Sequence, residues 1–153
     1  IPSPQNAFLL NLGLETLHLR MRQHCANAQR IAEFLHGDPR VAWVRYCGLD
    51  DDPCHDLARK YLPGGSCGVI AFGLKGTRET AIRWMDSLEL INIATHVADS
   101  RSCVLHPASH THRQLSDEQL RAAGIAPDLI RLSVGIEDAD DLLDDIRQAL
   151  DRL

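Results

Sequence analysis

The sequence lacks any run of 18 consecutive apolar residues, so it shows no pattern typical of a membrane-spanning helix. It also lacks an excess of positive charge, because 21 acidic residues outnumber 16 basic ones and the net charge is -5. Binding of nucleic acid through a basic surface is therefore not expected. No signal-peptide pattern opens the chain. We expect neither a membrane nor a nucleic acid among its partners.

Disulfide signals are missing as well. The five cysteines are odd in number and form no CxxC pair, a pattern typical of reduced thiols in a cytoplasmic protein. The 153 residues are 44% hydrophobic and 24% charged, as in an ordinary globular domain. A chain of this mass buries roughly 69% of its unfolded surface, enough for a sizeable core. Because the first residue is Ile1 rather than Met, we expect the chain to be part of a longer protein.

The first 37 residues are predicted to form one long helix. Ser3 and Pro4 are typical of a helix start, and Gly37 is typical of a helix end. Apolar residues recur between them in steps of three or four, at Leu10, Leu14, Leu17, Met21, Cys25, Ala28, Ala32 and Leu35. Such a helix is about 50 Å long, and a glycine at position 13 allows it to bend there. Its first turns then overhang the domain, and Leu9, Leu10 and Leu12 need a neighbouring domain or subunit to cover them.

Residues 38–153 are predicted to form an α+β domain. Strands are expected at 41–46, 67–74 and 129–134, with short extended segments at 90–95 and 103–105. Helices are expected at 55–62, after Thr77, between Ser116 and Gly124, and after Asp138. The order favours a mainly antiparallel sheet with helices packed on one face.

The strand that ends in RLSVGIE has one polar face. Its apolar face is expected to meet the helices and consists of Ile130, Leu132, Val134 and Ile136. Its other face carries Arg131, Ser133, Gly135 and Glu137. An arginine on a rigid strand suits bidentate recognition of a carboxylate, and Gly135 allows a close approach. A solvated sheet face with a surface arginine explains the same spacing.

Other patterns are weaker. His106, His110, His112 and Cys103 could be combined into a zinc site, but Pro107 disfavours a helix that would pair His106 with His110. The glycine-rich segment 63–68 lacks the spacing of a phosphate-binding loop. No spacing supports a pairing of a cysteine nucleophile with a histidine base.

Several motifs resemble the Cys/Met-metabolism family of pyridoxal-phosphate enzymes. The helix sequence at 3–35 looks like the helix that enters the family's C-terminal domain, and HPASHTH at 106–112 resembles its HPAS-x-TH signature. LIRLSVGIED at 129–138 is similar to its carboxylate-binding strand, and GVIAFGLKG at 68–76 to another strand. The resemblance covers the whole chain in order. It implies the small C-terminal domain of the aspartate-aminotransferase-like fold, known as fold type I.

The resemblance also implies site residues. Arg131 would bind the substrate α-carboxylate, Thr111 would support that site, and His96 would border it through its backbone. No catalytic residue, cofactor ligand or metal ligand is expected in this chain. The family's cofactor is pyridoxal phosphate, bound by a lysine of a large N-terminal domain. Lys60 and Lys75 are the only lysines here, and neither has the family's Ser-x-Thr-Lys context, so the chain alone is expected to be inactive and without cofactor.

The segment Ala98 to Ser102 (ADSRS) is closer to the GDAKS sequence of O-acetylhomoserine sulfhydrylases than to the GG-x-ES sequence of cystathionine synthases and lyases. The implied activity replaces the acetate of O-acetylhomoserine by sulfide or methanethiol, in a cytoplasmic homo-oligomer. A cystathionine γ-synthase or methionine γ-lyase domain is an alternative. A stand-alone module for small-carboxylate binding or oligomerisation is another.

Overall fold

A mixed sheet of five strands forms the centre of the fold. The structure, a computed structural model, describes all residues from 1 to 153. The strands are β1 (Val41–Arg45), β2 (Val69–Leu74), β3 (Asn92–Ile93), β4 (Cys103–Leu105) and β5 (Leu129–Ser133). Their order across the sheet is β1-β2-β5-β4-β3, and only the short pair β3 and β4 is parallel. The predicted mainly antiparallel sheet is confirmed.

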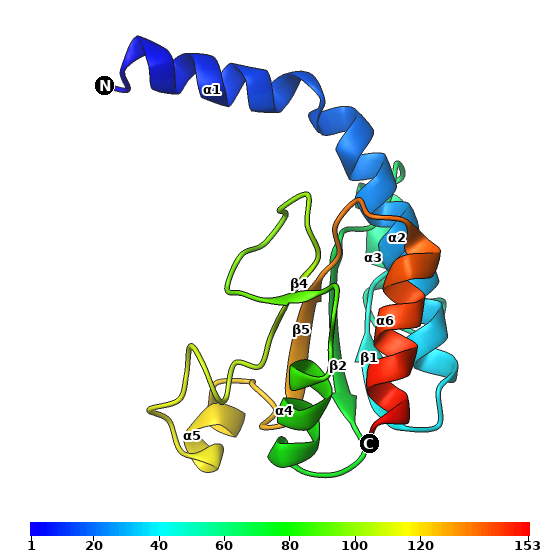
Figure 1. The fold of residues 1–153 in the computed structure, drawn as a ribbon. Coiled ribbons are helices and arrows are strands. Elements are labelled where there is room, and N and C mark those ends of the chain that lie inside the picture. The colour runs from blue at the N-terminus through cyan, green and yellow to red at the C-terminus, as the bar shows by residue number, and fades with distance from the viewer.

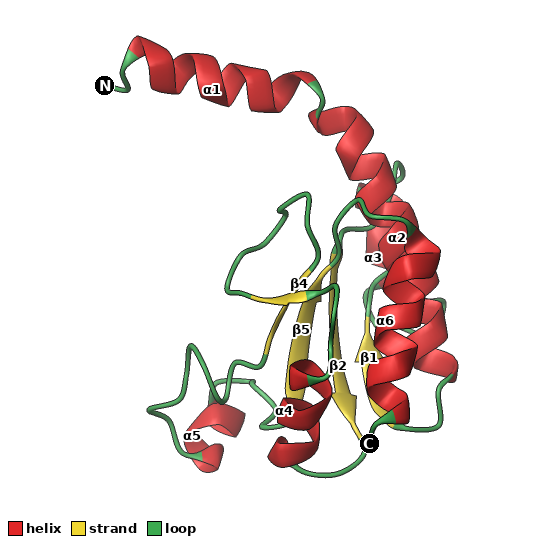
Figure 2. Ribbon diagram, viewed as in Figure 1, coloured by secondary structure: helices red, strands yellow, loops and turns green.

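Helices cover one face of this sheet (Figure 1). The core is formed by α2 (Leu17–Gly37), α4 (Arg78–Asp86) and α6 (Ala139–Asp151) on alternate residues of β2 and β5. Five strand residues, and Val134 just after β5, are fully or almost fully buried; the strand residues are Ile70, Phe72, Leu74, Ile130 and Leu132. Two shorter helices, α3 (His55–Tyr61) and α5 (Asp117–Ala122), lie outside this layer (Figure 2). The predicted α+β architecture is therefore confirmed.

The expected continuous N-terminal helix is wrong in one respect, because the chain breaks into α1 (Pro4–Glu15) and α2 at Thr16. Thr16 has φ -106° and ψ 5°, outside the helical range. The break leaves the Gly13 carbonyl free to accept a hydrogen bond from Arg20 Nη2 at 2.8 Å, and Arg20 Nη1 contacts Thr16 Oγ1. The bend therefore lies at Thr16, three residues beyond Gly13. Thr16 is β-branched, which disfavours the helical conformation, and Arg20 binds the Gly13 carbonyl at the break.

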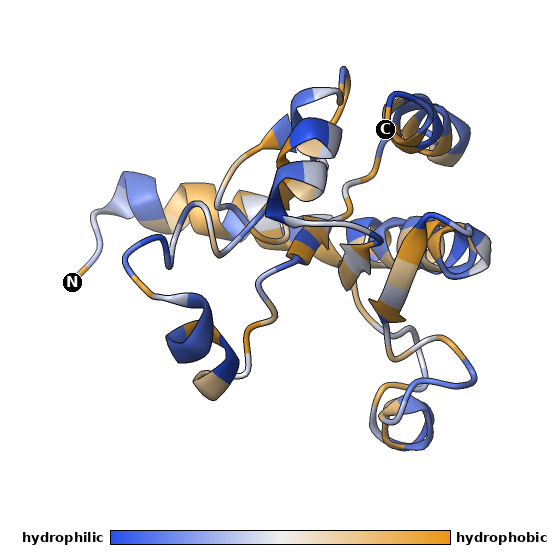
Figure 3. Cartoon of the chain, turned by 90° about the horizontal axis from the view of Figure 1, so that it is seen from below, coloured by the Kyte–Doolittle hydropathy of each residue, from blue (hydrophilic) through white to orange (hydrophobic).

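No residue of α1 is buried. Leu9, Leu10 and Leu12 are 56%, 65% and 50% exposed, as expected for an overhanging segment. Figure 1 shows α1 leading away from the rest of the domain, and Figure 3 shows apolar residues along it. Of the predicted stripe, only Ala28, Ala32 and Leu35 in the second half of α2 are buried, and Ile31 is buried beside them. The helix pattern predicts an apolar face along the whole segment, but other residues of this chain pack only against its part in α2.

Several helix starts follow the predicted capping chemistry. Ser116 Oγ accepts a bond from Gln119 N at 3.3 Å, and Gln119 Oε1 accepts one from Ser116 N at 2.9 Å. Asp138 Oδ1 accepts from Asp140 N at the start of α6. The predicted burial of Ile136 is wrong, because β5 ends at Ser133 and the alternation of faces ends with it. The last residue, Leu153, lies beyond the end of α6 and is exposed.

None of the helices combines the length and the apolar character that a membrane crossing requires.

Candidate functional site

Arg131 lies near the middle of the sheet on the face that the helices leave open. It is on β5, opposite Ala71 of β2 on one side and Leu105 of β4 on the other. Its neighbours in sequence, Ile130 and Leu132, are fully buried in the core. These two anchors fix the strand, so the guanidinium starts from a rigid backbone.

Backbone carbonyls hold the guanidinium of Arg131 without neutralising it. Nη2 donates to Thr95 O at 3.0 Å and to His96 O at 3.3 Å. Nε is buried and has no hydrogen-bond partner. No carboxylate forms an ion pair with this arginine, although eight other ion pairs between an arginine and a carboxylate occur in the structure. A buried N–H without a partner and an unpaired cation together fit an anionic ligand, and a carboxylate matches the planar guanidinium.

The two carbonyls belong to a loop, residues 95–102, that lies on the polar face of β5. Ser133 Oγ accepts a hydrogen bond from Ala98 N at 3.0 Å. Ser100 O accepts another from Ile136 N at 2.9 Å. The loop is thus attached to β5 at Ser133 and to the segment after β5 at Ile136, and its carbonyls are fixed above Arg131.

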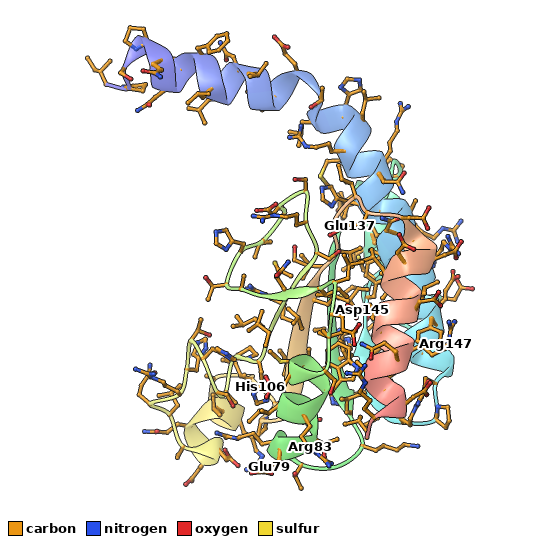
Figure 4. All side chains as sticks on the ribbon, viewed as in Figure 1. Glu79, Arg83, His106, Glu137, Asp145 and Arg147 are labelled. Atoms are coloured by element: carbon orange, nitrogen blue, oxygen red, sulfur yellow. The ribbon has the colours of Figure 1, made fainter.

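A third attachment joins Ser102 to Glu137. The Glu137 carboxylate accepts from Ser102 N at 2.6 Å and from Ser102 Oγ at 3.0 Å, while Ser102 Oγ accepts from Gly135 N at 2.8 Å. A Cβ on Gly135 would lie 2.5 Å from Ser100 O and 2.6 Å from Ser102 N. The predicted close approach at Gly135 is confirmed, and the approaching group is this loop. Figure 4 shows Glu137 between β5 and α6.

Polar residues of α2 hold the same turn from the other side. His24 Nδ1 lies 2.6 Å from Val134 O, to which it donates. Asn27 Nδ2 donates to Gly135 O at 3.1 Å and to Glu137 O at 2.8 Å. Sequence reasoning missed both residues, although two buried polar side chains next to Ala28 interrupt an apolar stripe and could have signalled a polar contact.

The loop stores local backbone strain. Ala98 has φ +60° and is the one non-glycine residue with positive φ. The left-handed conformation costs an L-residue roughly 1–2 kcal/mol relative to glycine. The bond from Ala98 N to Ser133 Oγ helps to hold this conformation.

The structure brings one of the other two predicted site residues to Arg131. The backbone of His96 contacts the guanidinium, as described above, while its side chain is exposed and lines a cavity of about 220 Å³ with Asp99, Arg101 and Cys103. Arg131 does not line that cavity. Thr111 lies elsewhere in the contact network: it is exposed, and its Oγ1 lies 2.9 Å from His112 Nδ1. Its supporting role stays a prediction.

Cys103 borders the arginine as a neutral donor. Its Sγ donates to His96 O at 3.0 Å. Burial raises the pKa of the Cys103 thiol, and the positive charge of Arg131 opposes that rise. The thiol therefore stays protonated and adds a further bond to the carbonyl that holds Arg131.

The histidine-rich segment is a packing element. His106 is fully buried, with Nε2 2.9 Å from Pro127 O and Nδ1 2.8 Å from Ser109 Oγ. Because a carbonyl only accepts, Nε2 carries the proton and Nδ1 accepts from Ser109. Burial lowers the pKa of His106, which keeps the ring neutral. No group of three or more His, Cys, Asp or Glu side chains is arranged to hold a metal ion.

The two lysines do not fit a covalent site for pyridoxal phosphate. Lys60 is exposed at the end of α3 and lies over the ring of Tyr61, 5.0 Å from its centre. Lys75 is exposed just after β2, and its backbone N donates to Arg40 O. Neither ammonium contacts Arg131 or its loop.

Comparison with known proteins places these features in one family. The family model for Cys/Met metabolism PLP-dependent enzymes matches residues 1–151. O-acetyl-L-homoserine sulfhydrylase 1 of Thermus thermophilus is 45% identical over 147 residues, which are 96% of this chain and 35% of that protein. L-methionine gamma-lyase of Pseudomonas putida is 47% identical over 150 residues, which are 97% of this chain and 37% of that protein.

A solved structure has the same fold. A Campylobacter jejuni protein described as an O-acetylhomoserine (thiol)-lyase, crystallised with N'-pyridoxyl-lysine-5'-monophosphate, matches with a TM-score of 0.90 and 43% identity. The match covers 97% of this chain and 35% of that one. The chain thus spans about a third of the length of the proteins it resembles, and the predicted fold class is confirmed.

Proposed function

The chain belongs to the Cys/Met metabolism PLP-dependent enzymes, and from that membership we propose that it is the C-terminal domain of an O-acetylhomoserine sulfhydrylase. The reaction would replace the acetate of O-acetylhomoserine by sulfide or methanethiol and give homocysteine or methionine. Named relatives with this activity at 45% and 43% identity support the proposal. The role of this domain is to bind the amino-acid substrate by its α-carboxylate.

The observation that carries this role is the state of Arg131. Its guanidinium is oriented by the carbonyls of Thr95 and His96, has a buried Nε without a partner, and pairs with no acid of its own chain. A substrate carboxylate would compensate the charge of the guanidinium, which no acid of this chain neutralises. Arginine on a strand whose flanking residues are in the core holds that carboxylate in one place, which is positioning catalysis.

The rest of the chemistry belongs to the part of the protein beyond this chain. Pyridoxal phosphate, when bound, withdraws electrons and stabilises negative charge at the substrate Cα. The lysine that binds the cofactor would come from a large domain, since neither Lys60 nor Lys75 is placed for it. Arg131 would orient the substrate so that its Cα proton faces that domain. The exposed apolar residues of α1 fit burial against the large domain or a second subunit.

Product analysis tests the proposed reaction. The protein containing this domain and its large domain is incubated with O-acetylhomoserine and sulfide, with O-acetylhomoserine and cysteine, and with methionine alone. The proposal predicts homocysteine from the first mixture as the product with the highest kcat/KM. If the main product were instead cystathionine, formed in the mixture with cysteine, the protein would be a γ-synthase and the proposal would be contradicted.

A methionine γ-lyase is the second candidate, because the Pseudomonas putida relative is 47% identical to this chain. It would release 2-oxobutanoate, ammonia and methanethiol from methionine. Release of these products at a kcat/KM above that of homocysteine formation would favour this candidate. Both candidates need the same carboxylate contact, so the assay separates the reactions and leaves the role of Arg131 to its own test.

A further inference from the structure

Three cysteines from distant parts of the sequence come together on the side of the domain where α2 meets the start of β2. Cys25 is on α2, Cys47 is in the turn after β1, and Cys67 is in the segment that leads into β2. All three are half-buried and none forms a disulfide. This cluster has no contact with Arg131 and no part in the proposed function.

Backbone and side-chain contacts fix the three segments against one another. Tyr46, next to Cys47, donates from its hydroxyl to Cys67 O at 3.0 Å. Gly48 follows Cys47 and Ser66 precedes Cys67. A Cβ on Gly48 would lie 3.1 Å from Ser66 Oγ, so these two residues lie close together. β1 and β2 are antiparallel, and Arg45 at the end of β1 lies opposite Ala71 near the start of β2. The turn after β1 therefore lies beside the segment that leads into β2.

The Cys25 side chain approaches the same entry. A Cβ on Gly65 would lie 2.9 Å from Cys25 Sγ. Burial raises the pKa of the Cys67 thiol, and the nearby Cys47 and Cys25 side chains add to that rise while a bond to Val69 O opposes it. Burial also raises the pKa of Cys25, again with a contribution from Cys47. The contacts of Tyr46 with Cys67, of Gly48 with Ser66 and of Gly65 with Cys25 therefore bring the three segments that carry these cysteines together.

Cys47 is also the cysteine of the three that reaches solvent through a cavity. A hollow of about 300 Å³ is lined by Cys47, His55, Arg59 and Ser66, among others, and by neither Cys25 nor Cys67. His55 Nδ1 is buried without a partner. A cavity needs roughly 10–15 Å³ of such volume to hold one water, so a small polar oxidant can enter this hollow.

We propose that Cys47 and Cys67 form a reversible dithiol site, in which a hydroperoxide oxidises Cys47 and Cys67 then closes a disulfide. The Cys47 thiolate attacks one peroxide oxygen, the O–O bond breaks, and Cys47 becomes a sulfenic acid as hydrogen peroxide is reduced to hydroxide, which is protonated to water. The Cys67 thiol then displaces the hydroxyl group from that sulfur, forming the S–S bond and a second water. Two thiols are oxidised by two electrons, and one peroxide gives two waters.

Backbone freedom selects Cys67 over Cys25 as the partner. A disulfide needs its two Cα atoms about 4.4–6.8 Å apart with suitable Cβ directions. Cys47 and Cys67 both lie outside helices and strands, where the chain can adjust, whereas Cys25 is fixed by the core residues of α2. Cys54 is exposed and Cys103 lies beside Arg131, and neither contributes to the interactions of Cys67.

Peptide mapping of the whole 153-residue chain tests this site. The folded chain is treated with a small excess of hydrogen peroxide, blocked with iodoacetamide and digested with trypsin. The three cysteines fall in separate peptides, 23–30, 46–59 and 61–75. We expect peptides 46–59 and 61–75 to be joined, at a mass lower by two hydrogen atoms than their sum. The link should disappear with dithiothreitol, and the chain should stay monomeric on a non-reducing gel.

Two variants assign the sulfur in peptide 46–59, which also contains Cys54. The link should persist in Cys54→Ser and be lost in Cys47→Ser. A link that survives Cys47→Ser, a dominant link between 23–30 and 61–75, or over-oxidation of Cys47 without any link would each overturn the proposal. The wild-type map alone gives the last two results, so the test does not depend on a variant that folds.

Discussion

Ser102 and Glu137, 35 residues apart in the sequence, are joined by two hydrogen bonds at the end of β5. The carboxylate accepts from both the backbone N, at 2.6 Å, and the Oγ, at 3.0 Å. This contact attaches the loop whose carbonyls orient Arg131 to the turn that begins α6. The position of the guanidinium therefore depends on a side chain six residues further along the same segment.

Loss of this attachment should weaken the fold. Glu137→Ala leaves the Ser102 N–H without its acceptor, which costs about 1–3 kcal/mol for a half-buried group with a charged partner. We expect a decrease of that size in the free energy of unfolding, measured by urea titration. Asp144→Ala is the matched control, since Asp144 only forms an exposed ion pair with Arg147 and should change stability by less than about 0.5 kcal/mol. Equal effects of the two variants would contradict the role of Glu137.

The strained residue of the loop gives a prediction of opposite sign. Ala98→Gly removes the roughly 1–2 kcal/mol cost of a left-handed alanine and adds about 0.5–1 kcal/mol of unfolded-state entropy. We expect the variant to be more stable by about 0.5 kcal/mol in the same urea titration. Ala94→Gly, at a position without positive φ, should instead be less stable. A loss of stability on Ala98→Gly would show that this conformation is not strained.

His106 makes stability dependent on pH in a defined window. Burial holds its folded pKa below the ordinary value of 6.5, so the unfolded chain binds the proton more readily. This contribution to stability is complete above about pH 6.5 and is lost as the pH falls from there through the folded pKa. Unfolding free energies between pH 7.5 and 5.5 should fall more steeply for the wild type than for His106→Asn.

His18, one of two exposed histidines of α2, serves as the control for this window. His18→Gln should keep the wild-type slope, because His18 is exposed to solvent. A slope in His106→Asn that equals the wild-type slope would assign the effect to other groups.

The uncovered apolar surface of α1 should cause self-association of the 153-residue chain. Leu10 and Leu14 are 65% and 61% exposed, together with Phe8 and Leu9 on the same helix. We expect a mass above that of a monomer by light scattering at high concentration. Leu10→Glu combined with Leu14→Glu should lower it toward the monomer, whereas Leu57→Glu, at an exposed leucine of α3, should not. A wild-type monomer at all concentrations would exclude this role of α1.

Local chemistry made much of the fold predictable. The caps at Ser116 and Asp138 and the alternation from Ile130 to Val134 all depend on neighbours in sequence, and the structure has them as predicted. The helix break at Thr16 was not predictable, since it depends on the Arg20 side chain reaching back to Gly13. Ile136 was placed in the core because the alternation was extended past the point where the strand ends.

The site was predictable only in part. Arg131 could be found from the sequence because it lies on the polar face of the predicted strand. The family resemblance pointed to His96, whose carbonyl contacts Arg131. The attachment of the loop could not be predicted, because Ser102, Glu137 and Asn27 meet only after strands far apart in sequence have paired. Asp145 shows the same limit: it is buried on α6 and accepts from the backbone N of Glu89, Leu90 and Ile91, a contact that no local pattern reveals.

The role of Arg131 as the carboxylate-binding residue is tested most directly by the kcat/KM of Arg131→Lys for O-acetylhomoserine, measured in the protein that includes the large domain. Lysine keeps the charge but not the planar pair of donors, so the account predicts a loss of roughly 10- to 150-fold, the size expected for charged hydrogen bonds of about 1.5–3 kcal/mol. Cofactor content, read from its absorbance, should stay at the wild-type level, and Arg147→Lys on the exposed side of α6 should keep full activity. An Arg131→Lys enzyme with unchanged kcat/KM would contradict the account.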